Sequence, residues 1–269
     1  MVDNYALTFV KADLHNYLRT SNIFSEGFAE KALERASKKL GKGAVIGVAD
    51  VDEHRYSKVK RGAENYLTHD LGVGFCVLGL DITVLRGERV FTKEGNILVL
   101  GLNEDEHVQS GRSIEDTLKQ AKDYNASIVL SNFSSRNKSR EVILTNLNLL
   151  TYVDAVEVHN GSQVFTDQNN TAQLFYEVYR NKFDIGAIIT SGGHSGYEIG
   201  SSWTLIPTLD YTSEAHLKKS IKEVLKQRRT PEMEHRSNSY IGATHHLVKH
   251  YLWSKQAGKR KIDERGMAE

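Results

Sequence analysis

Strand-like and helix-like segments alternate along most of this chain, and this alternation constrains the fold more than any other feature of the sequence. Amphipathic segments with helix start signals, such as those that open at Ser25, Ser113 and Ser213, lie between several apolar runs. The apolar runs, rich in β-branched residues, predict strands at about 5–15, 44–50, 75–84, 96–102, 127–133, 154–161 and 186–194. Such alternation predicts right-handed crossovers and a mostly parallel sheet.

Polar residues capable of chemistry stand at the end of nearly every predicted strand. They are Asp13, His15, Asp50, Asp81, Asn103, Asn132, Glu157, His159, Asn160, Ser191 and His194. An open, doubly wound sheet draws ligands from two or three strand ends at one switch point, whereas a barrel converges all its strand ends on one mouth. Contributions from so many strands favour an α/β barrel, with the open sheet as the alternative, and 269 residues is a normal length for one such barrel.

Asp13 and His15 follow the first apolar run and are two positions apart. On a strand this spacing points both side chains to the same face. Metal hydrolases often begin with Asp-x-His at the end of a first strand and a second histidine two residues further on. Tyr17 stands at that position, and a phenol is a poor metal ligand beside imidazole and carboxylate.

Three later segments carry further candidate site residues. Glu157 and His159 are also expected to share a face, and His159 suits a phosphate contact or an acid–base role as well as a structural hydrogen bond. Ser191 opens Ser-Gly-Gly-His-Ser-Gly, whose backbone N–H groups would cradle an anion or form a tight turn. Arg136 lies in the basic segment 134–140, which reads as a phosphate-attracting rim or as a solvated loop.

The composition favours a cytoplasmic protein without a membrane partner. A formal net charge of +1 gives no general attraction to nucleic acid or membrane. A single cysteine fits a reducing compartment, and neither a signal peptide nor an apolar run of membrane-spanning length is evident. Residues 235–269 depart from the alternation, so we divide the chain into a barrel at 1–234 and a C-terminal helix with a basic tail at 235–269.

Eight segments, taken in order over about residues 6–228, resemble the PHP family, named for polymerase and histidinol phosphatase domains. Asp13-Leu-His-Asn-Tyr17 stands where that family has Asp-Leu-His-x-His, and Gly79-Leu-Asp-Ile-Thr83 where it has Gly-x-Glu-Ile-Thr. Asp154-Ala-Val-Glu-Val-His-Asn-Gly161 and Thr190-Ser-Gly-Gly-His194 match later family segments. The resemblance implies a distorted seven-stranded β/α barrel, related to the TIM barrel, with a C-terminal helical extension.

The same resemblance implies a degenerate metal site. PHP proteins bind two or three metal ions at these strand ends and use them to activate a water and clamp a phosphate ester. By position, His15, Asp81 and His194 remain as ligands. The positions at which this chain departs from the family's His or Asp are Tyr17, Val51, Asn96, Asn132 and Gly192. The resemblance therefore implies one zinc, manganese or iron ion at most, or no metal at all.

Two functions remain open from the sequence. The first is a divergent phosphoesterase acting on a nucleotide, a nucleic-acid end or a small phosphorylated metabolite. Its candidate catalytic residues are His159, Asn132 and Asp50, and its candidate substrate contacts are Asp13, Tyr17, Asn160, Arg136 and Ser191. The second is a catalytically inactive PHP-derived protein that binds a protein partner or serves as a scaffold in a larger assembly.

Overall fold

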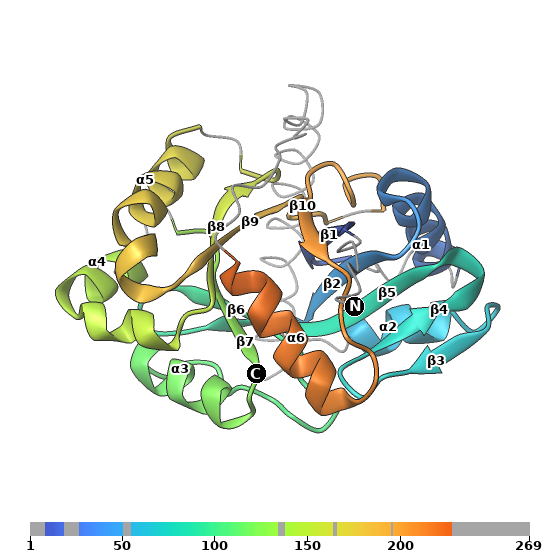
Figure 1. Cartoon of the computed structure of the whole chain (residues 1–269), viewed down its shortest axis with the longest axis horizontal. Helices are drawn as coiled ribbons and strands as arrows, with labels where there is room; N and C mark the ends of the chain where they lie inside the picture. The colour runs from blue at the N-terminus through green and yellow to red at the C-terminus, as the bar shows by residue number, and fades with distance from the viewer. Residues whose placement is uncertain are drawn as a thin grey trace, which may run out of the picture. The chain divides into compact units, whose positions relative to one another are not determined.

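The computed structural model describes residues 9–18, 27–50, 55–133, 138–163, 166–194 and 196–227. The strands are β1 (Phe9–Asn16), β2 (Ala44–Asp50), β3 (Thr68–Asp70), β4 (Gly74–Val77), β5 (Ile82–Phe91), β6 (Asn96–Leu100), β7 (Ser127–Leu130), β8 (Ala155–Asn160), β9 (Gly186–Thr190) and β10 (Thr204–Pro207). The helices are α1 (Gly27–Leu40), α2 (Arg55–Gly62), η1 (Leu78–Leu80), α3 (Ile114–Asp123), α4 (Lys138–Thr145), η2 (Leu147–Tyr152), α5 (Thr166–Phe183) and α6 (Glu214–Lys226) (Figure 1). The C-terminal helix and basic tail expected at 235–269 lie outside the described residues.

The strands form one sheet that bends into a nearly closed barrel. Its path runs β10-β1-β2-β5-β6-β7-β8-β9, and β6 is antiparallel to both of its neighbours, whereas β1, β2 and β5 pair in parallel, as do β7, β8 and β9. The ring closes where Asn16 and Gly193 form a parallel bridge and the Tyr17 N–H donates to the Gly193 carbonyl at 2.7 Å. The ring from β1 to β9 therefore contains seven strands, as predicted, while β10 and the β3–β4 hairpin lie beside it.

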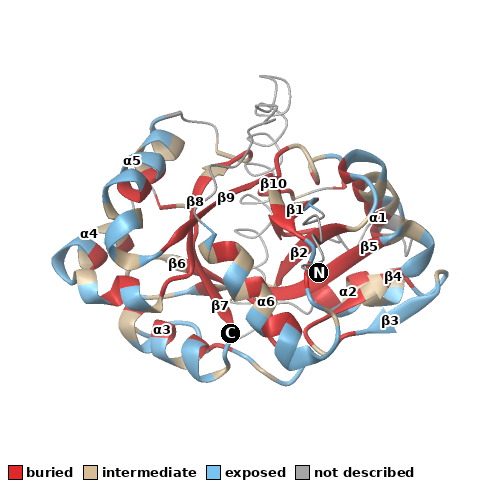
Figure 2. Cartoon of the chain, viewed as in Figure 1, coloured by how far each residue is buried: buried red, intermediate tan, exposed pale blue. Residues whose placement is uncertain are grey.

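Helix α6 covers the amino-terminal ends of the parallel strands. The carbonyl oxygen of Leu225 lies so close to Gly186, the first residue of β9, that no side chain fits there. Ile221 packs near Gly101, which follows the antiparallel strand β6, and joins the interior apolar cluster with Leu14 and Leu98. The opposite end, where β1, β2, β5, β7, β8 and β9 terminate and β6 begins, is called the mouth below. The strands of the ring are almost entirely buried, whereas β3 and the outer faces of the helices are exposed (Figure 2).

Local sequence signals account for two of the helix starts. The side chain of Ser113 accepts a hydrogen bond from the Asp116 N–H at 3.1 Å, and that of Ser213 accepts one from the His216 N–H at 3.2 Å. Both serines are N-caps, as the sequence predicts. Among the helices that the structure describes, none combines the length and apolar character needed to span a bilayer.

The strand predicted at 75–84 is wrong, because two strands share that segment. The chain ends β4 at Val77, turns through η1, and begins β5 at Ile82, antiparallel to β4. Asp81 makes this reversal possible with a left-handed backbone conformation, φ 50°. The barrel strand is therefore β5, which extends to Phe91. Its hairpin to β6 closes with the Thr92 N–H donating to the Gly95 carbonyl at 2.7 Å.

Candidate functional site at the barrel mouth

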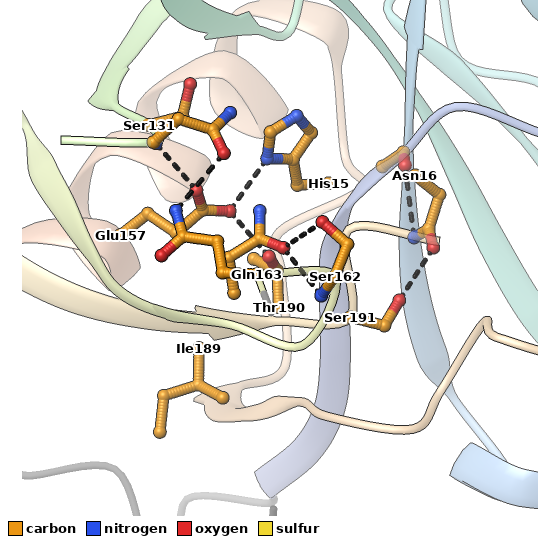
Figure 3. Close-up of polar contacts among 12 residues, drawn as sticks. His15, Asn16, Ser131, Glu157, Ser162, Gln163, Ile189, Thr190 and Ser191 are labelled. Carbon is orange, nitrogen blue, oxygen red and sulfur yellow. Dashed lines mark hydrogen bonds and ion pairs between the residues drawn. The ribbon is translucent and has the colours of Figure 1, made fainter. Parts of the chain in front are cut away.

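A buried carboxylate and a buried imidazole meet at the mouth. Nδ1 of His15 lies 2.7 Å from Oε1 of Glu157, and neither side chain is exposed (Figure 3). The Thr190 hydroxyl donates to the same carboxylate oxygen at 2.5 Å, and the Asn132 N–H donates to the other at 3.0 Å. Burial raises the pKa of Glu157, but the charge of His15 and the hydrogen bonds from His15, Thr190 and Asn132 outweigh it and lower the pKa to about 2. Glu157 is therefore ionised, and His15 donates through Nδ1.

The second nitrogen of His15 faces a phenol. Nε2 of His15 lies 2.6 Å from the Tyr17 hydroxyl, and the Asn132 side chain also hydrogen-bonds that hydroxyl. A neutral His15 that donates through Nδ1 accepts the Tyr17 proton at Nε2, whereas in the charged form that lowers the pKa of Glu157 both ring nitrogens donate. Burial, the main cause, raises the pKa of Tyr17 to about 12 against the opposing charge of Arg89, so the phenol stays protonated near neutral pH. Glu157, His15 and Tyr17 form a continuous hydrogen-bonded set, called the polar triad below.

An irregularity in strand pairing turns His15 toward Glu157. Along β1 and β2, Asp13 pairs with Ile46 but Asn16 pairs with Val48, so β1 contains one extra residue. Such a bulge reverses the in-and-out alternation of the side chains that follow it. The prediction that Asp13 and His15 share a face is therefore wrong.

A second irregularity affects β8 in the same way. Glu157 pairs with Ile188 and His159 with the next residue, Ile189. Glu157 precedes the bulge and points into the barrel like Ala155, whereas after the bulge Nδ1 of His159 lies 3.2 Å from the Asn169 side chain of α5. The prediction that Glu157 and His159 share a face is also wrong, and His159 lies outside the polar triad.

Asp13 anchors β1 to the segment that follows β9. Its carboxylate accepts hydrogen bonds from the Ser191 N–H at 3.0 Å, the Ser191 hydroxyl at 2.5 Å and the Gly200 N–H at 2.8 Å. Burial raises the pKa of Asp13, and these hydrogen bonds offset part of that rise. Both side chains have an exposed fraction of 0%. The structure thus places the predicted substrate contacts Asp13 and Ser191 in a buried structural contact.

The structure brings together only two of the three predicted metal ligands. The His194 ring stacks on the Tyr17 ring with centroids 4.5 Å apart, and His15 meets the same ring edge-on. Asp81 is exposed at the amino-terminal end of β5, where its carbonyl accepts from the Gly43 N–H at 2.7 Å. Asp81 therefore lies at the opposite end of the barrel, because the strand boundary that the sequence suggested was misplaced.

The other predicted residues have separate partners. Asp50 accepts from the Tyr56 N–H at 2.8 Å and lies 3.7 Å from Nε of Arg86, and burial raises its pKa. Asn160 accepts from the backbone and hydroxyl of Ser162 at 2.9 and 2.6 Å, which closes a turn. Arg136 lies outside the described residues. Of the three predicted catalytic residues, only Asn132 contacts the polar triad.

Sequence reasoning missed Arg89, whose guanidinium carbon lies 5.4 Å from the Tyr17 ring centroid. The signal was present in the sequence. Gly87-Glu88-Arg89-Val90 repeats the Gly-x-Glu-Ile spacing of the PHP family, with arginine at the glutamate position, and it lies at the mouth because Glu88 pairs with Asp50 at the end of β2. The match at Gly79–Thr83 looked better by sequence but belongs to the wrong end of β5.

The described residues do not fit a metal centre. Within the described ranges, no three His, Cys, Asp or Glu side chains gather as potential ligands. Both nitrogens of His15 are engaged, and the carboxylate of Glu157 already accepts hydrogen bonds from three residues. The guanidinium of Arg89 adds positive charge that opposes a cation. The single-ion site predicted at His15, Asp81 and His194 is therefore not formed.

Comparisons with known proteins show likeness in fold. No protein-family model and no curated protein sequence matches the chain. PsfC from Pseudomonas syringae PB-5123 superposes with a TM-score of 0.56 at 14% identity, over 93% of this chain and 99% of PsfC. Endonuclease Q, solved with a 27-mer duplex carrying an abasic lesion at the active site, gives 0.54 at 14% identity, over 81% of this chain and 57% of the endonuclease.

A third similar structure carries the PHP name. It is a two-domain protein from Bacteroides vulgatus ATCC 8482 that contains a predicted PHP-like metal-dependent phosphoesterase, with a TM-score of 0.51 at 16% identity. The match covers 82% of this chain and 64% of that protein, so this chain spans less than two thirds of it and of Endonuclease Q. Together with the nearly closed ring of seven strands, these likenesses give the chain a PHP-like β/α barrel fold.

Proposed function

We propose that this chain binds a phosphate ester at the mouth of its barrel and does so without a multinuclear metal centre. The observation that carries the proposal is the polar triad. The Tyr17 hydroxyl lies 2.6 Å from Nε2 of His15, at the atom through which a histidine in this position would otherwise hold an ion. At Tyr17 and Asn132, two of the positions that depart from the PHP pattern, the mouth carries groups that hydrogen-bond within the triad or to it.

The ligand class comes from the proteins of similar fold. One contains a predicted phosphoesterase, and another is an endonuclease solved with a DNA duplex. Both names describe chemistry at phosphate esters. For this chain we propose a nucleotide, a nucleic-acid end or a small phosphorylated metabolite as the ligand.

Hydrolysis is the second candidate function, and one specific observation favours it. A carboxylate that orients an imidazole toward a hydroxyl is an arrangement that supports proton transfer. Because the pKa of Tyr17 is about 12, Tyr17 would act as a proton donor near neutral pH and not as an attacking phenolate. This candidate gives His15 the acid–base role that the sequence assigned to His159.

Binding and turnover can be separated in one set of measurements. Isothermal titration calorimetry with chelator present would compare a 5′-phosphorylated oligonucleotide, its unphosphorylated counterpart and a nucleoside monophosphate. We expect binding only of the phosphorylated ligands, and no product in parallel hydrolysis assays with added zinc or manganese. Equal binding of both oligonucleotides, or no binding of any ligand, would contradict the proposal.

A matched pair of histidine variants tests the second candidate. His15→Gln changes the triad, whereas His69→Gln changes an exposed histidine on β3. Turnover that disappears in His15→Gln and persists in His69→Gln would establish hydrolysis at this site. Turnover that survives in both variants would assign it to a contaminant.

A further inference from the structure

Arg89 is a cation at the mouth that pairs with no acidic side chain of the described residues. Its side chain is half-buried near the carboxyl end of β5, and within the described part of the chain it forms no ion pair. Its guanidinium carbon lies 5.4 Å from the Tyr17 ring centroid and 5.1 Å from that of Phe91, and its buried Nε has no hydrogen-bond partner. The two rings stabilise the cation only in part, so a partly desolvated guanidinium with an unpaired N–H gains further from an approaching anion.

A second guanidinium approaches the same tyrosine from another element. Arg55, the first residue of α2, is 9% exposed, and its guanidinium carbon lies 5.9 Å from the Tyr17 ring centroid. Its Nη1 donates to the Tyr17 carbonyl at 3.2 Å, which fixes its direction. The Asp50 carboxylate caps the first turn of α2 by accepting from the Tyr56 N–H at 2.8 Å.

The nearby carboxylates are committed elsewhere. Glu157 accepts hydrogen bonds from His15, Thr190 and Asn132. Two further described acids near the mouth, Asp50 and Glu88, contact Arg86, which is three residues from Arg89 and therefore on the opposite face of β5. Among the described residues, Arg89 therefore has no carboxylate partner, and its guanidinium is available to an incoming anion.

We infer that Arg89 is a metal-independent binding site for a phosphoryl group. This inference rests on the proposed function and deepens it by naming the group that holds the phosphate. A planar guanidinium presents parallel N–H donors that match two oxygens of one phosphate. At the position where the PHP pattern has a carboxylate that helps to hold a cation, this chain has a fixed cation of its own.

The test uses inorganic phosphate and adenosine monophosphate as probes of the full chain, titrated by calorimetry in buffer with chelator. Arg89→Met keeps the apolar stem against the two rings but removes the charge, and we expect it to weaken binding of both probes by about tenfold or more. Arg89→Lys should recover part of the affinity, because it restores charge without the planar donors. Arg61→Met removes an exposed arginine from the last turn of α2 and should leave affinity unchanged.

The outcomes separate this inference from the proposed function. Two results would overturn the arginine site but not phosphate binding itself. In the first, Arg89→Met binds the phosphate ester as well as the wild-type protein does. In the second, the wild-type protein loses binding in chelator and regains it with zinc or manganese. No binding of either probe by the wild-type protein overturns both. Because the chelator measurement needs only the wild-type protein, the inference stays testable even if a variant fails to fold.

Discussion

Nδ1 of His15 and Oε1 of Glu157 lie 2.7 Å apart although the two residues are 142 positions apart in the chain. Their strands are not neighbours, because β9 lies between β8 and the closing strand β1. The contact therefore reaches past a whole strand inside the barrel. It links the beginning of the sheet to its end at a point where the ring is held by few backbone hydrogen bonds.

Replacing Glu157 by methionine is expected to destabilise the protein strongly. Methionine has a similar volume but leaves the donors of His15, Thr190 and Asn132 without their acceptor. Because buried groups that lose their partner are costly, we expect a loss of about 3 kcal/mol or more in the free energy of unfolding. Urea denaturation measures it, with Glu64→Met as an exposed control that should change stability by about 0.5 kcal/mol or less. Equal midpoints for the two variants would contradict a structural role for the triad.

Glu157 should also shape the acid dependence of stability. Its pKa falls from 4.5 to about 2 in the folded protein, so the unfolded chain binds more protons between these values. The stability that Glu157 supplies is complete above about pH 4.5 and is lost as the pH falls through about 2.

The measurement is the free energy of unfolding from about pH 2 to 5 for the wild-type protein and Glu157→Gln. Glutamine does not titrate, so the variant should show a smaller increase in stability over this range. Burial raises the pKa of Asp13, which acts in the opposite direction, but Asp13 is present in both proteins and cancels in the difference. Parallel curves would show that Glu157 titrates normally.

Gly192→Ala is expected to disturb the turn after β9. Gly192 has φ 59°, and an added Cβ would lie 2.1 Å from Oδ1 of Asn160 and 2.5 Å from the Ser162 hydroxyl. Strain and collision together should cost about 2 kcal/mol or more. Gly111→Ala provides a matched control, because Gly111 has φ 80° with nothing near its Cβ position. The difference between the variants isolates the collision, and equal losses would show that backbone strain alone matters.

A metal site should form when positions 17 and 89 are both given the metal-ligating residues of the PHP pattern, histidine and glutamate. Tyr17→His with Arg89→Glu removes the phenol and the guanidinium and supplies an imidazole and a carboxylate beside His15 and His194. We expect the double variant to bind zinc or manganese in stoichiometric amounts, measured by elemental analysis after dialysis.

The control for that experiment is Tyr17→His with Arg89→Gln, which removes the positive charge without adding a carboxylate. We expect it to bind less metal than the glutamate variant. Metal content in the glutamate variant no higher than in the wild-type protein would show that Arg89 does not occupy a former ligand position.

The barrel was predictable because its strands are short apolar runs separated by helix signals with recognisable N-caps at Ser113 and Ser213. The boundary at Asp81 was not, because residues 73–84 form one apolar run and only the pairing of β4 with β5 divides it. Because of this misplaced boundary, Asp81 was predicted as a metal ligand and Arg89 was not recognised as a residue of the site.

The directions of the site side chains could also not be predicted from the sequence. His15 faces Glu157 because β1 contains an extra residue relative to β2, and His159 points away from Glu157 because β8 contains one relative to β9. Strict alternation instead grouped His15 with Asp13 and Glu157 with His159. Pairing register arises from contacts between distant segments, so neither bulge has a local signature.

The two bulges have a consequence for comparing this chain with other sequences. A comparison without gaps across β1 or β8 equates residues that point to opposite sides of the sheet whenever the other protein lacks the extra residue. The role of His15 can therefore be transferred only to proteins whose first strand contains the same extra residue between the aspartate and the histidine. For this fold, insertions of one residue in a strand are as informative about chemistry as the identities of the residues themselves.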